Sequence, residues 1–192
     1  MTATAREEIL DAYARLVVDG GTKAATLESV ARDAGVSKGG LLYHFPSKAK
    51  LAEGLAERLE AMVGDDVADM RAHPQGPTER LLRSSDDTDS SFTLCYDAVC
   101  RLAMNGDERS RGALRAAHRG WESALESEIP DPVVARAVVL ISDGLSMRSG
   151  AGLPYEPAAT GGTTRGEAAG GAEDDAIAEI VALVRDRLLP RA

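Results

Sequence analysis

Hydrophobic positions recur every three or four residues along most of the chain, which is the spacing of one buried face of an α-helix. The repeat runs through residues 9–18 near the start, and Gly20-Gly21 predicts its end. No segment alternates hydrophobic and polar residues as a half-buried strand does. The predicted fold class is therefore all-α, with further helices expected over 27–34, 38–44, 47–70, 78–82, 92–104, 107–128, 133–147 and 176–189.

Two of these segments, 27–34 and 38–44, are short and close together. Thr26 and Ser37 precede them as N-cap residues, and Gly35 between them suits a left-handed turn. Two short helices joined by a turn that contains glycine are typical of a helix-turn-helix motif. We therefore expect a three-helix DNA-binding domain over residues 1–46 and a larger helical domain over residues 47–192.

Other features of the pattern predict the setting of these domains. Residues 149–172 contain seven glycines and two prolines without periodicity, which predicts a flexible loop. No apolar run is longer than five residues, as at residues 137–141, which is far short of the ~20 residues of a membrane-spanning helix. The N-terminus lacks the pattern of a secretory signal, so we expect a cytoplasmic protein. Cys95 and Cys100, five residues apart, are expected to be buried thiols.

Charge separates the beginning of the chain from the rest. The formal net charge is −9, but residues 1–51 carry seven Lys/Arg and six Asp/Glu. From Val36 to Ala52 there is no acidic residue, while Lys38, Lys48 and Lys50 all fall there. This segment is the part of the sequence best suited to face a phosphate backbone.

The string from Thr26 to Lys48 resembles the DNA-binding domain of the TetR family of bacterial transcriptional regulators. The resemblance covers residues 6 to about 55, and the series Gly-Val-Ser…His-Phe-Pro-Ser-Lys at residues 35–48 is specific. It implies about nine helices, three of them in the DNA-binding domain and the others in a domain that dimerises and binds a small ligand. Leu42 departs from the pattern, because the family most often has Tyr there and this chain has Tyr43 one place later.

The residue types in this string fit contact with double-stranded DNA. Lys38 opens the recognition helix, where side chains meet base edges in the major groove. Gly39 and Gly40 let the helix backbone approach closely, and Tyr43, His44 and Lys48 are placed for phosphates. The residues predicted to bind DNA are Thr26, Ser37, Lys38, Gly39, Gly40, Leu42, Tyr43, His44 and Lys48.

Beyond the first 50 residues, large side chains gather on the two helices expected over 92–104 and 107–128. They form either ordinary core or the wall of a ligand cavity, since cavities are mostly apolar and aromatic with few polar groups. The residues predicted to line the cavity are Phe92, Tyr96, Met104, His118 and Trp121.

The last two apolar stripes are candidates for a dimer interface in the form of a four-helix bundle. The alternative is that both stripes are buried within one subunit. The stripes consist of Val133, Val134, Val138, Ile141 and Leu145 on one helix and Ile177, Ile180, Val184 and Leu188 on the other.

The predicted function is that of a homodimeric repressor that a small-molecule ligand releases from a near-palindromic operator. One alternative is a DNA-binding protein whose second domain only dimerises or binds a protein partner, and another is an enzyme fused to a helix-turn-helix. Residues 35–39 match the G-x-S-x-G pattern of hydrolases, but a helix precedes them where that chemistry needs a strand. The three histidines lie far apart in the sequence, so no metal site is expected. We also predict that the protein has no cofactor and no enzymatic activity.

Overall fold

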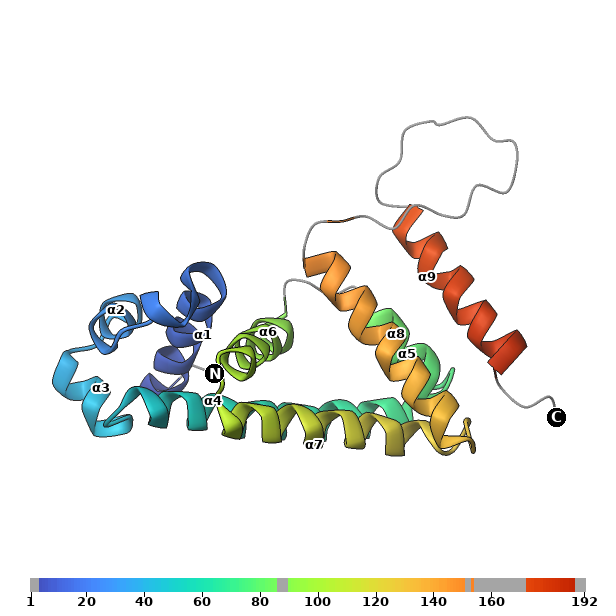
Figure 1. Cartoon of the computed structure of the whole chain (residues 1–192), viewed down its shortest axis with the longest axis horizontal. Coiled ribbons are helices and arrows are strands. Elements are labelled where there is room, and N and C mark those ends of the chain that lie inside the picture. The colour runs from blue at the N-terminus through green and yellow to red at the C-terminus, as the bar shows by residue number, and fades with distance from the viewer. Residues whose placement is uncertain (1–3, 86–89, 151–152, 154–171, 189–192) are drawn as a thin grey trace. The chain divides into compact units, whose positions relative to one another are not determined.

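The computed structural model describes residues 4–85, 90–150, 153 and 172–188 (Figure 1). Over these residues it contains helices and no strand, which confirms the all-α prediction. The helices are α1 (Ala5–Ala24), α2 (Leu27–Asp33), α3 (Lys38–His44), α4 (Lys48–Ala72), α5 (Pro77–Ser84), α6 (Ser91–Met104), α7 (Glu108–Leu125), α8 (Pro132–Gly150) and α9 (Ala172–Leu183), and the π-helical turn η1 (Val184–Leu188) follows α9.

Helices α2 and α3 begin and end close to the predicted residues, whereas α1 extends beyond the expected range 9–18 and past Gly20-Gly21 to Ala24. Gly21 breaks the helical run of α1 with a φ of 74°, and Gly35 ends α2 with a φ of 66°. Thr26 and Ser29 form a capping box at the start of α2, and Ser37 caps α3 by accepting a hydrogen bond from the Gly40 N–H at 3.0 Å. These local interactions produce the predicted helix-turn-helix.

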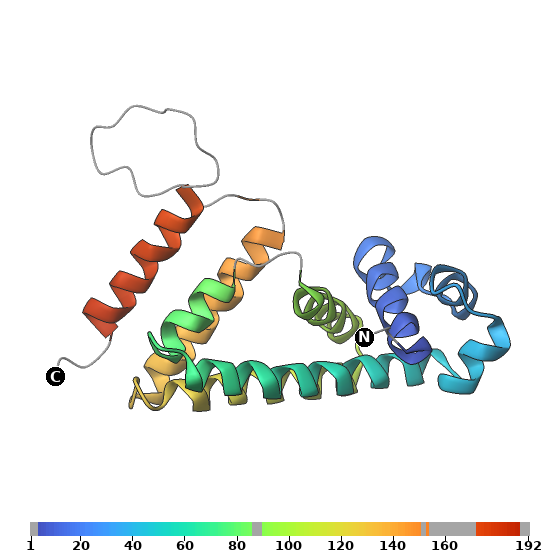
Figure 2. The same ribbon diagram turned by 180° about the vertical axis from the view of Figure 1, so that it is seen from behind.

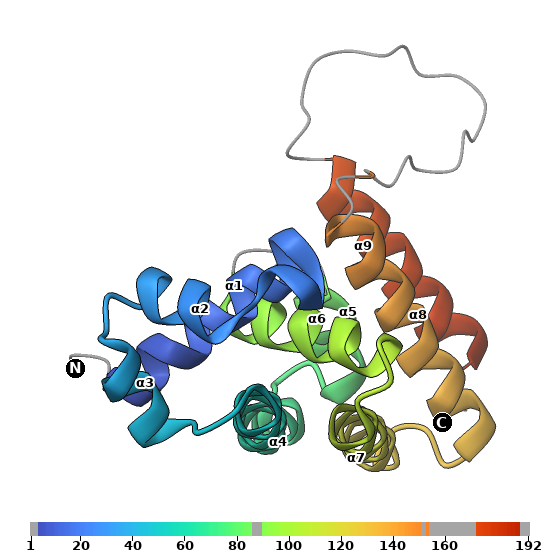
Figure 3. The ribbon, with the colours of Figure 1, turned by 60° about the vertical axis from the view of Figure 1, so that its left-hand side comes forward.

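The chain packs as two compact units. The first comprises Met1–Asp66 and Asp89–Gly120, and the second comprises Val67–Thr88 and Trp121–Ala192. Within the first unit α6 packs closely against α1, as Figure 3 shows. The helix-turn-helix therefore shares its compact unit with α6 and most of α7.

The core of the first unit holds the side chains that fix the helix-turn-helix in place. Apolar residues of α1, α4 and α6 are almost fully buried there, and the Leu55 carbonyl accepts a hydrogen bond from Cys95 Sγ at 3.7 Å. Arg58 of α4 pairs with Asp11 of α1, and Arg109 of α7 makes a two-pronged ion pair with Glu60 of α4, at 2.5 and 2.7 Å. The buried apolar side chains include Ile9, Leu10, Tyr13, Val17, Leu51, Leu55, Leu59 and Val99.

In the second unit, α5 contacts both α8 and α9. Figure 2 shows α5 beside α8. The Thr78 N–H donates to the Glu128 carboxylate at 3.0 Å, and the Ser85 and Ser142 hydroxyls lie 2.6 Å apart in the interior. Arg185 of η1 pairs with the buried Glu79 of α5 at 2.7 Å. Polar contacts thus join the C-terminal end of the described chain to α5.

Some predicted boundaries differ from the observed ones. Gly76 precedes α5 and Thr78 lies inside that helix, because Pro77 already occupies its first position. Helix α8 continues to Gly150 and α9 begins at Ala172, so both enter the range expected to be a loop. The rest of that loop, apart from Leu153, lies outside the described residues. None of the described helices is long and apolar enough to cross a membrane.

Candidate nucleic-acid interface

Helix α3 has one buried side and one exposed side. Leu41 and the C-cap residue Phe45 are buried in the first unit. Tyr43 is the most exposed of the large side chains here, and its ring meets the His44 ring edge-on at 5.2 Å between centroids. A seven-residue helix held by two apolar side chains presents its remaining surface to solvent, as a recognition helix must. We define the exposed face of α3 as Lys38, Gly39, Leu42, Tyr43 and His44.

The two glycines of α3 have different surroundings. A Cβ built on Gly39 would meet nothing within 4 Å, whereas one on Gly40 would lie 3.3 Å from Ser37 Oγ. Packing within the chain therefore does not require glycine at position 39. The predicted role of Gly39, to let a nucleic-acid backbone or base come close, stays a prediction.

Thr26 and Ser37 already use their hydroxyl groups within the chain. Thr26 Oγ1 accepts from the Ser29 N–H at 3.1 Å, and Ser37 Oγ accepts from the Gly40 N–H at 3.0 Å. Both hydroxyls satisfy amide groups that a helix leaves without a partner at its start. Their position at the two helix starts agrees with the prediction, and in this structure they fix the helices in place.

Residues 36–52 contain no acidic residue, but acidic side chains from outside this range lie next to two of their lysines. Lys38 Nζ lies 2.7 Å from Glu28 Oε1 of α2, and Lys50 Nζ lies 2.5 Å from Glu53 Oε2 of α4. The Lys38 ammonium holds the pKa of Glu28 below its usual range, and the Glu53 carboxylate raises the pKa of Lys50. The charge inferred from residues 36–52 alone is thus partly compensated by acidic groups just outside that range.

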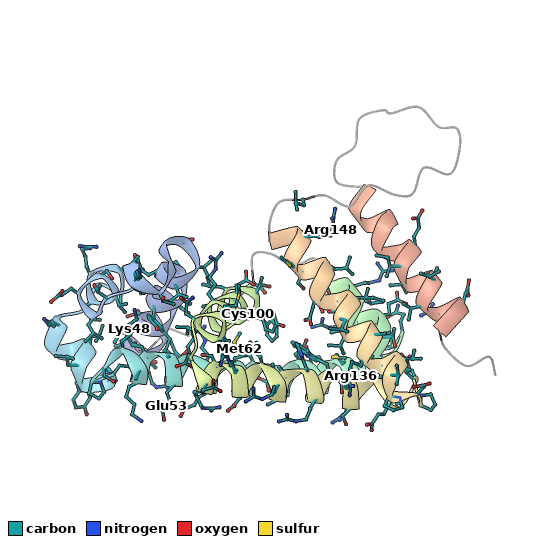
Figure 4. The ribbon with its side chains drawn as sticks, in the orientation of Figure 1. Lys48, Glu53, Met62, Cys100, Arg136 and Arg148 are labelled. Carbon is teal, nitrogen blue, oxygen red and sulfur yellow. The ribbon has the colours of Figure 1, made fainter. Side chains whose placement is uncertain are left out.

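Lys48 differs from these two lysines because its partner is neutral. Its Nζ donates a hydrogen bond to the Thr22 carbonyl at the end of α1, and the side chain is half-buried. Figure 4 shows Lys48 on the side of α4 that faces α1, with Glu53 on the other side. Because the carbonyl is neutral, it does not compensate the positive charge, and it accepts a hydrogen bond from only one of the three N–H groups of the ammonium. Lys48 therefore fixes the start of α4 while keeping its charge.

Glu28 is the residue of this surface that sequence reasoning missed. It lies in the first turn of α2, and no sequence spacing links it to a residue ten positions later. A signal was nevertheless present, because Glu28 lies in the first turn of one helix of the motif and Lys38 opens the other. The structure places these two charges next to each other.

The predicted cavity residues are only partly brought together. Tyr96 stacks on Phe92 at 6.3 Å between centroids, and its hydroxyl lies 3.3 Å from His118 Nε2. Contrary to the prediction, Met104 is 84% exposed and is not part of an enclosed lining. Trp121 is buried and begins the second compact unit. Next to Tyr96, burial raises the pKa of Asp97, an acidic group that sequence reasoning did not include.

The predicted dimer stripes prove to be two different faces. Val138, Leu145 and Val184 are buried within the single chain, so the prediction that they form the seam between subunits is wrong. The exposed apolar positions of α8 lie seven residues apart at Val133, Leu140 and Met147, which are 72%, 61% and 79% exposed. We call these three residues the α8 stripe. The periodicity predicts the helix correctly. It does not predict which side of α8 is buried, because that side is set by the contact with α5.

No group of three or more His, Cys, Asp or Glu side chains that could hold a metal ion occurs in the described part of the chain. Cys95 is buried as predicted, and burial raises the pKa of its thiol to about 11. Cys100 is half-buried.

Two family models match the chain. Residues 9–55 match the model described as bacterial regulatory proteins, tetR family, and residues 75–165 match the model described as tetracyclin repressor-like, C-terminal domain. The chain belongs to the TetR family. Members of this family are DNA-binding transcription regulators rather than enzymes, which fits the exposed recognition helix described above.

Solved structures of TetR-family proteins share the fold over nearly the whole chain. A family member from Streptomyces coelicolor A3 (SCO1917) superimposes with a TM-score of 0.68 at 19% identity, and the match covers 98% of this chain and 100% of the other. The multidrug binding protein EbrR, complexed with malachite green, gives a TM-score of 0.65 at 24% identity over 97% and 98% of the two chains. The fold of this TetR-family chain is thus shared at low sequence identity.

Curated relatives match a shorter region. The nucleoid occlusion factor SlmA of Aliivibrio fischeri is 42% identical over 111 residues, which is 57% of this chain and 49% of the relative. The protein of the same name from Vibrio vulnificus is 45% identical over a match of the same extent. The chain spans about half the length of the curated relatives that it matches.

Proposed function

We propose that this TetR-family regulator is a cytoplasmic homodimeric repressor that leaves a near-palindromic operator when a small-molecule ligand binds. The observation that carries the proposal is the exposed face of α3, held by Leu41 and Phe45 so that Lys38 and Tyr43 point to solvent. A recognition helix that inserts its N-terminal residues into the major groove needs this arrangement. Thr26, Ser37, Gly40 and Lys48 belong to the same proposed set of DNA contacts.

Dimerisation follows from the size of one recognition helix. A single helix-turn-helix contacts few base pairs and few phosphates, so useful affinity requires two copies that bind two half-sites together. A dimer would also explain why large apolar side chains face solvent on one side of α8.

The α8 stripe has the pattern of a helix that packs against a second copy of itself. Val133, Leu140 and Met147 are spaced by seven residues, and the small residues Ala137 and Gly144 lie between them at the spacing of a coiled-coil seam. A Cβ on Gly144 would meet nothing within 4 Å in the single chain, so packing inside the subunit does not require glycine there. Glycine inside a helix costs about 1 kcal/mol relative to alanine. Close approach of the partner's α8 gives a reason for that cost.

The experiment that tests the function is selection of DNA from a random double-stranded library by the purified protein. We expect enrichment of an inverted repeat whose half-sites lie about one helical turn apart. Binding that shows no preference among the library sequences would overturn the proposal.

The ligand part of the proposal rests on Phe92, Tyr96 and His118, whose contacts combine stacked rings with a polar pair. It is also supported by the neighbour that is named as a multidrug binding protein. Small molecules that raise the melting temperature should release DNA, and Tyr96→Phe should weaken both effects for the same molecule. Met104→Ala, on an exposed residue, is the matched control that should change neither.

One observation favours the alternative in which the second domain only dimerises or binds a protein partner. The curated relatives are named for nucleoid occlusion and not for a ligand response. If no molecule that shifts the melting temperature alters DNA binding, the alternative replaces the ligand-responsive repressor.

A further inference from the structure

The pair formed by Glu28 and Lys38 lies at the start of both helices of the helix-turn-helix. Glu28 belongs to the first turn of α2 and Lys38 is the first residue of α3, with 2.7 Å between Oε1 and Nζ. Their side chains are 74% and 59% exposed, so burial does not hold them together. A pure acceptor and a pure donor therefore stand side by side next to the exposed face of α3.

The edges of base pairs in the major groove present donors and acceptors in a fixed order. A G·C pair presents guanine N7 and O6 as two neighbouring acceptors, followed by the cytosine N4 amino group as a donor. An A·T pair presents acceptor, donor and acceptor in that order, and C·G reverses the order of G·C. Lysine is a usual partner of the guanine acceptors, and glutamate is a usual partner of the cytosine amino group.

We propose that Lys38 and Glu28 together read one G·C pair in each half-site, with Lys38 on guanine and Glu28 on cytosine. This inference rests on the proposed function, since it requires α3 to enter the major groove. The lysine ammonium spans the two guanine acceptors while the adjacent carboxylate accepts from the cytosine amino group. At an A·T pair at least one of these hydrogen bonds is lost.

Glu28 in this arrangement determines specificity more than affinity. A carboxylate close to DNA is repelled by the phosphates, and only the cytosine amino group and the lysine offset that repulsion. On a sequence without the G·C pair, the carboxylate remains near the phosphates without the cytosine hydrogen bond. The residue thus acts mainly by weakening binding to other sequences.

The experiment compares base preferences of four proteins selected on the same random double-stranded library: wild type, Glu28→Ala, Glu28→Gln and Lys38→Met. We expect Glu28→Ala and Lys38→Met to reduce the preference for G·C at the same position of the half-site by roughly tenfold. Glu28→Gln should fall between wild type and Glu28→Ala, because the amide oxygen still accepts a hydrogen bond. Helical circular dichroism confirms that each variant is folded.

Glu53→Ala is the matched control, because Glu53 also pairs with an exposed lysine, Lys50, but on α4. It should leave every base preference unchanged. If Glu28→Ala raises affinity equally for all sequences and leaves the preferences intact, Glu28 only neutralises Lys38 and the inference is wrong. The inference alone also fails if Glu28→Ala and Lys38→Met alter different positions. A wild-type protein that selects no sequence would instead overturn the proposed function, and the inference with it.

Discussion

Helices α3 and α8 each turn a row of side chains to solvent, and the two rows differ in chemistry. The exposed face of α3 carries one large aliphatic residue, Leu42, beside a lysine, a glycine, a tyrosine and a histidine, whose polar groups water can solvate. The α8 stripe carries Val133, Leu140 and Met147, which water does not solvate favourably. The first surface can remain open until DNA arrives. The second is expected to be covered whenever the protein is folded and concentrated enough to dimerise.

The two helices also differ in what holds them in place. Helix α3 has seven residues, two of them glycine, and it depends on Ser37, Leu41 and Phe45. Helix α8 has 19 residues and buries Ala135, Val138 and Leu145 on its inner side. A change on α3 should therefore alter recognition with little effect on the fold, while a change on α8 should act on the fold or on assembly according to the side it faces.

The largest effect is expected for Val138→Glu on the inner side of α8. Val138 is fully buried, so the new carboxylate would lose its hydration without gaining a partner. We expect the free energy of unfolding to fall by about 4 kcal/mol, measured by urea denaturation at a fixed protein concentration. A stable monomer in place of an unfolded protein would mean that Val138 faces the partner after all.

The next largest effect is expected for Leu140→Glu, two residues further along the same helix. Leu140 belongs to the exposed α8 stripe, so the variant should keep its helical content and sediment as a monomer. Losing the second half-site should weaken operator binding by at least about a hundredfold. Met104→Glu is the matched control, because it also places a carboxylate on an exposed apolar residue, here on α6, and it should remain dimeric. A dimeric Leu140→Glu would place the seam elsewhere.

The sequence predicts features that depend on neighbouring residues better than features that depend on how helices pack. Caps, glycines and apolar period act locally, so the roles of Thr26, Gly35 and Ser37 and the ends of α2 and α3 could be predicted from the residues alone. The identity of the buried side of α8 and the pairing of Lys38 with Glu28 depend on how helices cross, and neither could be read from spacing. For the same reason Met104 fitted a helical stripe yet lies at the surface.

A smaller effect, on DNA affinity and its dependence on salt, is expected to distinguish Lys48 from Lys50. The Lys48 ammonium has a neutral partner, the Thr22 carbonyl, whereas Lys50 is paired with Glu53. We expect Lys48→Met to weaken binding to all DNA sequences and to lower the salt slope of affinity by about one unit. Lys50→Met should change the slope less, because Lys50 would have to leave Glu53 to meet a phosphate. Equal slopes for wild type and Lys48→Met would restrict Lys48 to its contact with Thr22.

The smallest effect on stability, about 1 kcal/mol, is expected for the two matched caps Ser37→Ala and Ser90→Ala. Ser37 Oγ accepts from the Gly40 N–H at 3.0 Å and Ser90 Oγ accepts from the Thr93 N–H at 3.1 Å, so each variant loses the same kind of hydrogen bond. The consequences should differ, because α6 has 14 residues and packs along α1, whereas α3 has seven and leaves most of its surface open. Amide hydrogen exchange should therefore quicken through all of α3 in Ser37→Ala but only in the first turn of α6 in Ser90→Ala.

Operator affinity should fall for Ser37→Ala alone, since only that variant must reorder its recognition helix on binding. An equal loss of affinity in both variants would show that the integrity of α6 matters to DNA binding as much as that of α3, and the contrast between a locally held recognition helix and a firmly packed support would not hold.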